Sequence, residues 1–235
     1  MNQWSMKRFW QSAAIEETGE EFAIRLDGRP VRTPAKRVLA VPTRTIAEKI
    51  AAEWEAQDKT VDPRTMPWTR SANAALDKVA PQRKAVEDYI AAYAETDLLC
   101  YRAEGPASLI ARQEAAWDPI LDWMSQRYGV RLSVTRGVMP VEQDPDATGR
   151  LAKAMAPLTD FQLTAFHDLV TLPGSFVLGL AAIEEAAPPL DLWGASHVDE
   201  DWQIGEWGDD EEAAEAAAFR QKAYLHASDF YRAAS

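Results

Sequence analysis

The sequence of 235 residues is poor in the side chains that build disulfide or metal sites, with one cysteine, Cys100, and three histidines. One cysteine cannot form an intramolecular disulfide bond, which excludes the usual disulfide-stabilised secreted scaffold and favours a reducing compartment. Apolar residues flank Cys100, so we expect a buried, inert thiol rather than a nucleophile. His167, His197 and His226 have no second His or Cys at metal-ligand spacing, so no zinc site is expected.

The chain also lacks the short motifs that carry common enzyme chemistry. It has no Walker phosphate loop and no G-x-G-x-x-G fingerprint, and Gly174-Ser175 lacks the frame of a nucleophile elbow. His167, Asp168 and Ser175 could form a triad, but an ordinary hydrogen bond of His167 on a mixed helix face is the preferred interpretation. We expect no catalytic residue, metal or cofactor and no tight nucleotide binding, and we favour a binding protein over an enzyme.

No long apolar run is present. The N-terminal residues lead into no apolar segment typical of a signal peptide. The longest apolar run, residues 176–183, is too short to cross a bilayer. These observations predict a cytoplasmic protein without membrane insertion.

The charge is unevenly distributed, because residues 154–219 contain 14 Asp and Glu but no Lys or Arg. The whole chain has 37 acidic and 25 basic residues, a net charge of −12, and the part outside this region is close to neutral. Such an acidic chain is a poor candidate for nucleic-acid binding, which depends on neutralising phosphates. The acidic region is either a solvated face that keeps the protein soluble or a surface that attracts a basic partner.

Nine tryptophans are present, and Trp193, Trp202 and Trp207 lie inside the acidic region. Tryptophan is costly to leave exposed and is enriched at binding hot spots. A surface on which carboxylates alternate with tryptophan is suited to binding a basic, partly apolar polypeptide. The alternative is that each of these side chains packs one side of its helix into the core.

The apolar pattern predicts an α+β fold, in which a small N-terminal antiparallel β domain precedes a larger, mainly α-helical domain. Phe22, Ile24 and Leu26 alternate with other residues at the period of a strand. Asp27-Gly28 follows directly and is typical of a two-residue hairpin turn. Three or four short antiparallel strands are therefore predicted in the first forty residues.

The first predicted helix follows these strands. Ile46, Ile50 and Trp54 lie four residues apart, and Thr45 with Glu48 fits a capping box. Trp54 is predicted to be a structural residue that packs between the two domains.

Prolines in residues 58–69 predict a connecting segment, and the domain boundary is placed there. The predicted domains are residues 1–62, a β-rich domain with one helix, and residues 63–235, an α-helical domain.

The first part of the helical domain is expected to contain one long helix. Ser108 is expected to cap this helix, which contains Trp117 as a structural residue and Pro119 in its interior. Leu132, Val134 and Val138 then suggest an isolated strand or an extended segment.

Further helices are predicted in the acidic region. Thr159 with Gln162 fits a second capping box. Residues 176–187 are apolar almost all round and predict a buried helix, and another helix is expected over residues 190–206. Residues 209–212 would place negative charge at the start of the last helix, where the helix dipole favours it.

Several segments, taken together and in order, resemble the ATP-twelve family over roughly residues 7–232. The segments are L-D-G-R-P-V-R-T-P (26–34), I-A (46–47) through E-W-E-A-Q (53–57), M-P-W-T (66–69), T-D-L-L-C-Y-R (96–102), W-D-P-I-L-D-W (117–123) and D-E-D-W-Q-I-G-E-W-G (199–208). Members of this family are chaperones that escort the α subunit during assembly of the catalytic head of the F-type ATP synthase.

The resemblance implies a non-enzymatic protein that binds the unassembled α subunit and shields the surface that later meets the β subunit. Eukaryotic members carry a mitochondrial presequence, which is absent here. A bacterial cytoplasmic protein, or a processed form in the mitochondrial matrix, is therefore expected. We expect a monomer whose partner is the α subunit.

The resemblance also implies a sensitive acidic position in the acidic–tryptophan segment, for which Glu200 and Glu206 are the candidates, and a second sensitive position at Trp54. The predicted client-binding residues are Asp199, Glu200, Trp202, Gln203, Glu206 and Trp207. The alternative function is a small-molecule enzyme, or a regulatory protein for a basic ligand, with a site between the two domains.

Overall fold

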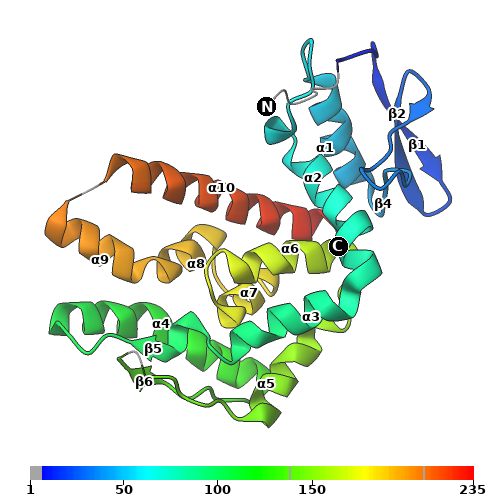
Figure 1. Cartoon of the computed structure of the whole chain (residues 1–235). Helices are drawn as coiled ribbons and strands as arrows, with labels where there is room; N and C mark the ends of the chain where they lie inside the picture. The colour runs from blue at the N-terminus through cyan, green and yellow to red at the C-terminus, as the bar shows by residue number, and fades with distance from the viewer. Residues whose placement is uncertain (1–6, 138, 209) are drawn as a thin grey trace. The chain divides into compact units, whose positions relative to one another are not determined.

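The computed structural model describes residues 7–137, 139–208 and 210–235 (Figure 1). The chain forms two compact units. The first unit contains the described residues up to Arg83, Thr159–Ala165 and Asp229–Ser235, and the second contains Lys84–Leu158 and Phe166–Ser228. The domain boundary placed near Asp62 stays a prediction.

The first unit contains the predicted antiparallel sheet. Its strands are β1 (Ala13–Thr18), β2 (Glu21–Leu26), β3 (Arg29–Pro30) and β4 (Ala40–Val41). Strand β2 is central, with β1 along one edge and both β3 and β4 along the other. Asp27 and Gly28 have φ values of +47° and +79°, as the predicted two-residue hairpin turn requires. The prediction of three or four short N-terminal strands is confirmed.

Helix α1 (Arg44–Glu55) packs on this sheet, with Ile46, Ile50 and Trp54 in the core of the unit. The capping box predicted at Thr45 is wrong, because Oγ1 of Thr43 accepts the Ile46 N–H at 3.3 Å and the helix already begins at Arg44. Two threonines lie two residues apart here, and only the first has the extended backbone of a cap.

The residues beside Trp54 fix the chain that follows α1. The buried Glu53 carboxylate accepts the N–H groups of Trp68 at 2.7 Å and Thr69 at 2.8 Å, in the first turn of α2 (Pro67–Ala74). Burial raises the pKa of Glu53, and its hydrogen bonds from Thr69 and Trp68 oppose that rise. The Gln57 amide donates to Thr65 Oγ1 at 3.1 Å and accepts from the Asp62 N–H at 2.7 Å. The proline-containing segment is therefore held to α1 by side chains.

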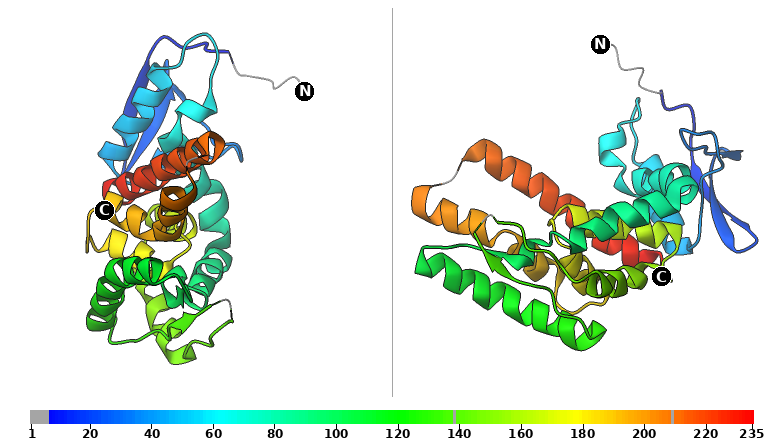
Figure 2. Two further views of the ribbon diagram at one scale, coloured as in Figure 1. Left: turned by 90° about the vertical axis from the view of Figure 1, so that its left-hand side faces the viewer. Right: turned by 60° about the horizontal axis from the view of Figure 1, so that its bottom comes forward.

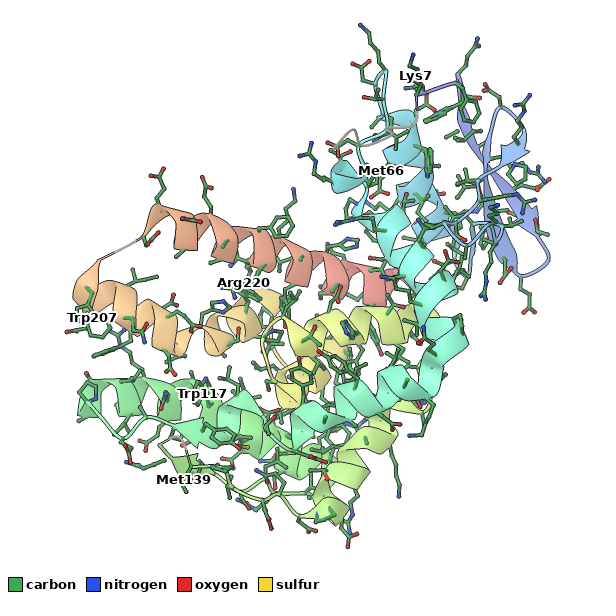
Figure 3. The ribbon with its side chains drawn as sticks, viewed as in Figure 1. Lys7, Met66, Trp117, Met139, Trp207 and Arg220 are labelled. Atoms are coloured by element: carbon green, nitrogen blue, oxygen red, sulfur yellow. The ribbon has the colours of Figure 1, made fainter. Side chains whose placement is uncertain are left out.

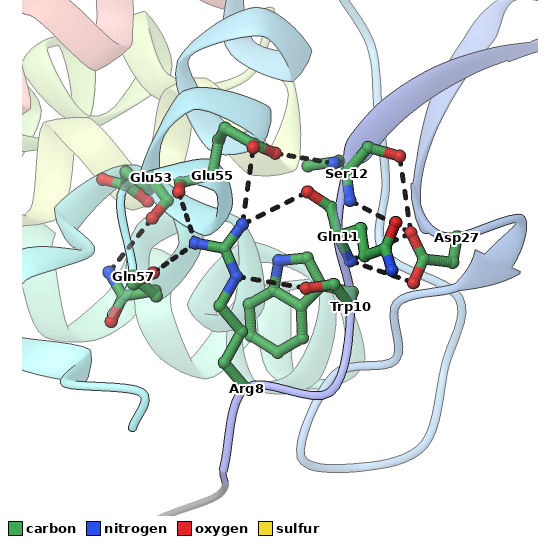
Figure 4. Close-up of polar contacts among 9 residues, drawn as sticks. Arg8, Trp10, Gln11, Ser12, Asp27, Glu53, Glu55 and Gln57 are labelled. Carbon is green, nitrogen blue, oxygen red and sulfur yellow. Dashed lines mark hydrogen bonds and ion pairs between the residues drawn. The ribbon is translucent and has the colours of Figure 1, made fainter. Parts of the chain in front are cut away.

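Arg8 ties the first described residues to the end of the same helix (Figure 4). Its guanidinium donates to the carbonyl oxygens of Glu55 and Gln57 and to the Glu55 carboxylate. The Glu55 carboxylate also accepts the Ala13 N–H at 2.8 Å, at the start of β1. A cation at the C-terminal end of a helix complements the helix dipole, so this contact stabilises α1 as well as the N-terminal segment.

The second unit is mainly helical, as predicted (Figure 2). The helices of the rest of the chain are α3 (Arg83–Ala91), α4 (Ala107–Tyr128), α5 (Pro145–Ala152), α6 (Asp160–Thr171), α7 (Phe176–Ile183), α8 (Pro189–Ser196), α9 (Val198–Trp207) and α10 (Glu211–Ala233). Strands β5 (Tyr101–Arg102) and β6 (Thr135–Arg136) form a short parallel pair. Helices α3, α6 and α10 contribute residues to both units.

The sequence predicts some helix boundaries and misses others. The capping box at Thr159 is confirmed, because its N–H donates to Gln162 Oε1 at 2.9 Å and its Oγ1 accepts the Gln162 N–H at 3.2 Å. Ser108 does not cap the long helix, since α4 begins at Ala107 after Pro106. Val138 and Asp209, placed in a predicted extended segment and at a predicted helix start, lie outside the described residues.

The single helix predicted over residues 190–206 is wrong, because α8 and α9 are separated at His197, which has a φ of −118° and a ψ of 18°. Ser196 Oγ donates to the Trp193 carbonyl at 2.7 Å, and His197 Nδ1 lies 3.1 Å from the same oxygen. These side chains bond to the backbone where the helix would otherwise continue, which ends it.

Helix α7 is the buried helix that its composition predicts, although it ends at Ile183 rather than near residue 187. It lies very close to α6, since a Cβ added to Gly179 would lie 2.4 Å from Val170 Cγ2. Glycine is therefore required at this crossing.

Asp97 organises the start of α7 from the interior of the second unit. The fully buried Asp97 carboxylate accepts from Ser175 Oγ at 2.8 Å, the Val177 N–H at 2.9 Å and the Leu99 N–H at 3.0 Å. Burial raises the pKa of Asp97 to about 6, against the lowering effect of these hydrogen bonds. Ser175 also accepts the Leu178 N–H at 3.0 Å and so is the N-cap of α7, held by Asp97 rather than by His167.

We predict that Trp54→Ala lowers the free energy of unfolding by about 3–5 kcal/mol, because the cavity left by the ring cannot close fully. The Trp54 ring is 8 % exposed and packs edge-on against Trp10 with 5.2 Å between ring centroids. Chemical denaturation measures the change. Trp207→Ala is the matched control, since Trp207 is 75 % exposed, and equal effects of the two substitutions would contradict the assignment of Trp54 to the core.

We predict that Asp97 makes the protein less stable as the pH rises from about 4 to 7. Its pKa is about 6 when folded and ordinarily 3.8, so the folded chain binds more protons here between these values. The contribution of Asp97 to the free energy of unfolding is therefore fully present below its unfolded pKa. It is lost as the pH rises through its folded pKa. The unfolding free energy of wild type minus that of Asp97→Asn should fall by up to about 3 kcal/mol over this range. A difference that is constant with pH would overturn the assignment, and Asp191→Asn, at an exposed carboxylate, is the control.

Candidate functional site

All six predicted client-binding residues lie on α9, with Asp199 and Glu200 in its first turn. Helical spacing places different residues on two sides of α9. One side presents Glu200, Ile204 and Trp207, and another presents Asp199 and Trp202. The first side is open to solvent, because Ile204 is 44 % and Trp207 is 75 % exposed. An exposed tryptophan and isoleucine beside a carboxylate form a surface that is both apolar and negative.

The other side of α9 is fixed to α4, alongside which it lies (Figure 1). The Asp199 carboxylate accepts from Gln113 Nε2 at 2.6 Å, and Gln113, which is 1 % exposed, accepts the Ala103 N–H at 2.8 Å. Trp202 Nε1 donates to Ser108 Oγ at 3.3 Å. Asp199 and Trp202 therefore anchor the helix, and the client-binding role of all six residues stays a prediction.

The Trp202 anchor also supports the exposed ring. The Trp202 and Trp207 rings meet edge to face, with 5.8 Å between their centroids, and Trp207 lies at the far end of α9 (Figure 3). This contact restricts the Trp207 side chain, so less side-chain entropy would be lost if a partner covered it.

Trp117 connects α4 to α8, the helix that precedes α9. It is 1 % exposed, and its Nε1 donates to the Ala195 carbonyl at 2.6 Å. The Arg102 guanidinium lies over its ring at 5.0 Å and donates to Asp118 at 2.7 Å. Trp193 is also buried, at 5 % exposure, so its side chain packs in the core rather than on the acidic surface.

The carboxylates of the acidic region fall into two groups. Some have partners within the fold. Asp160 forms an ion pair with Arg83, and Glu184 forms an ion pair with Arg127 and accepts a hydrogen bond from Tyr128. In contrast, Glu200, Asp201 and Glu206 are exposed and form no ion pair with any described residue. The negative charge of α9 is therefore available to a partner.

Of the large apolar side chains exposed in this region, the predicted client-binding residues include Trp207 but not Leu190, Ile204 or Phe219. Phe219 on α10 is 69 % exposed, and Glu212 and Glu215 lie seven and four residues before it. The helical spacing of Phe219 with Glu212 and Glu215 can be read from the sequence. The many alanines around these residues make that pattern hard to recognise.

The remaining candidates for chemistry have structural surroundings. Cys100 is fully buried, and burial raises the pKa of its thiol to about 12, with the nearby Asp97 charge acting in the same direction. Among residues 7–137, 139–208 and 210–235, no group of three or more His, Cys, Asp or Glu side chains could hold a metal ion. Within the same residues, no helix combines the length and the apolar character needed to cross a membrane.

Comparison with known proteins decides the family. Residues 7–125 match the model of the ATP12 chaperone protein. The chain belongs to the ATP12 chaperone family. The chain is 44 % identical to Atp12 from Paracoccus denitrificans, with a TM-score of 0.95 over 99 % of this chain and 100 % of that one. It is 38 % identical to the Atu1473 protein from Agrobacterium tumefaciens, with a TM-score of 0.93 over 97 % and 86 %.

A curated relative is more distant. The mitochondrial protein atp12 of Schizosaccharomyces pombe is 25 % identical over 224 residues, which cover 90 % of this chain and 77 % of the relative. The family resemblance and the α+β fold predicted from the sequence are confirmed by these matches.

The segments that carry the family resemblance play different parts in the structure. Residues 53–57 hold α2 and the proline-containing segment, and residues 96–102 hold the start of α7. Residues 117–123 include Trp117, which joins α4 to α8. Residues 199–208 differ from these segments, because α9 contains no fully buried residue. This last segment is therefore the candidate for recognition rather than for packing.

We predict that Asp199→Ala and Glu200→Ala, one residue apart on α9, differ in stability. Removing Asp199 leaves the buried Gln113 amide without an acceptor, which costs about 1–3 kcal/mol of unfolding free energy. Removing the exposed Glu200 should change the same quantity by less than about 0.5 kcal/mol. Chemical denaturation of both variants tests the distinction, and equal stabilities would contradict the anchoring role of Asp199.

Proposed function

We propose that this protein is an assembly chaperone of the F-type ATP synthase, which binds the unassembled α subunit until the β subunit replaces it. Its family membership supports the chaperone role, and the family resemblance of its sequence supports the choice of client. It acts without enzymatic turnover, in the bacterial cytoplasm or the mitochondrial matrix.

The observation that carries the proposal is the exposed side of α9. Trp207 is 75 % exposed next to carboxylates that have no cation of their own among the described residues. The helix that presents them is anchored through Asp199 and Trp202. A large exposed ring on a fixed helix marks an interaction site more strongly than a ring on a mobile loop.

The chemistry of this surface suits a chaperone that is later displaced. An unassembled subunit exposes an apolar interface, which is an aggregation hazard until it is covered. The chaperone has to bind quickly and still release its client to the final partner. Attraction between opposite charges accelerates encounter more than it lengthens the life of the complex, and a small apolar contact adds limited affinity.

We predict that the double variant Glu200→Gln/Glu206→Gln associates more slowly with the α subunit, while its dissociation changes less. The loss of two negative charges weakens steering, and raising the salt from about 0.05 to 0.5 M should slow wild type in the same way. Stopped-flow binding measures the rates, and light scattering measures protection of the α subunit from aggregation.

The matched control is Glu20→Gln/Glu21→Gln, which changes the net charge equally at the exposed β1–β2 hairpin. All variants are first shown to be folded by denaturation. Equal rates and equal protection for the two double variants would overturn the steering role and leave the acidic face as a solubility device.

A further inference from the structure

A second exposed row of side chains lies on the helix that follows α9. Glu212, Glu215 and Phe219 occur at positions i, i+3 and i+7 of α10, which places them on one side of the helix. Phe219 is 69 % exposed, and both glutamates are exposed without an ion pair to any described residue. The first turn is fixed by Asp210, whose Oδ1 accepts the Glu212 N–H at 2.9 Å and the Ala213 N–H at 3.2 Å.

The row on α10 has the same chemistry as the row on α9. On α9 a glutamate, Glu200, precedes the apolar Ile204 and Trp207 by four and seven residues, and on α10 Glu212 precedes Phe219 by seven. Seven residues of helix span about 10 Å, so each row places a carboxylate and an aromatic ring about two turns apart. From the turn at Gly208 the two helices run in opposite directions (Figure 1, Figure 2).

We infer that α9 and the first half of α10 together form a docking site for a basic amphipathic helix of the client, with Trp207 and Phe219 as its aromatic anchors. The identity of the client rests on the proposed function. The kind of partner, a basic amphipathic helix, is inferred only from the exposed aromatic rings and from the carboxylates that have no ion-pair partner among the described residues.

A helix fits this surface better than an extended segment. Both rows repeat at helical spacing, and a helix lying along them has the same rise of about 1.5 Å per residue. Lysines or arginines seven residues apart, with apolar residues between them, would meet the glutamates and the rings together. Side chains on one face of a strand are about 7 Å apart, which does not match a separation of two turns.

The charge distribution further defines the occupant. No Lys or Arg occurs between residues 154 and 219, so a cationic partner meets no like charge from this stretch of chain. Arg220 and Lys222 follow Phe219 directly, which ends the negative part of α10 at the aromatic ring. The surface therefore favours a cationic partner over an anionic one such as nucleic acid.

The test uses the full chain and two synthetic peptides of roughly 18 residues, a length at which helix formation is accessible. The first peptide has Lys and Arg along one side of a helix and Leu along the other. The second has the same composition in an order without an amphipathic face. Calorimetry measures binding, and circular dichroism of the mixture measures helix formation by the peptide.

We expect the amphipathic peptide to bind and become helical, and the scrambled peptide to bind about tenfold or more weakly. Phe219→Ala should weaken binding about tenfold, as loss of an aromatic anchor does, and Glu212→Gln/Glu215→Gln should weaken it and reduce its salt dependence. Leu190→Ala, on α8, is the control because Leu190 is 56 % exposed and lies outside both rows.

Equal binding of the two peptides, or equal effects of Phe219→Ala and Leu190→Ala, would overturn the docking site. The α subunit itself separates this inference from the proposed function. If the protein protects the α subunit and Phe219→Ala protects it equally well, the proposed function stands and the docking site on α10 is wrong. If the peptide binds as expected but the α subunit is not protected, the docking site stands and the proposed client is wrong.

Discussion

Two helices of this protein begin in its interior, and their first amide groups need acceptors that water cannot supply there. Glu53 meets this requirement for α2, and Asp97 with Ser175 meets it for α7. A buried carboxylate is costly unless several donors surround it, and each of these two has at least three. The position of α2 against α1, and of the apolar α7 within the second unit, depends on these contacts.

The need of charged groups for partners also shows how the surface of α9 differs from the rest of the second unit. Several charged groups elsewhere in the second unit are paired, as in the contacts of Arg102 with Asp118 and of Glu184 with Arg127. On α9 only the inward side follows this rule, through Asp199 and Gln113. The outward carboxylates have no such partner among the described residues and are exposed, so they cost no desolvation in the free protein and would gain a counter-charge from a cationic partner of the kind proposed.

Some local patterns predicted the fold correctly, whereas the capping box at Thr45 and the single helix over residues 190–206 were wrong. The alternation in β2, the Asp27-Gly28 turn and the Thr159 capping box depend on neighbouring residues alone. Long-range contacts were not predictable in this way. The capping role of Glu53 needs an amide fifteen residues away, and the anchoring of Asp199 needs Gln113, which is 86 residues away. The sequence indicated the segment of the candidate site, but only the fold separates its anchors from its exposed side chains.

The separation of anchor and exposed side chain also bears on how a client can be released. A partner that binds Trp207 or Phe219 does not have to disturb the bonds of Asp199 and Trp202, which belong to the other side of α9. If a client binds these side chains as proposed, its binding and release require no unfolding of the chaperone, and its rate of release is set by a small apolar contact and by charge pairs at the surface. Because such pairs are weak and screened by salt, the proposed binding mode would allow a final partner with a larger apolar interface to replace the chaperone without an input of chemical energy.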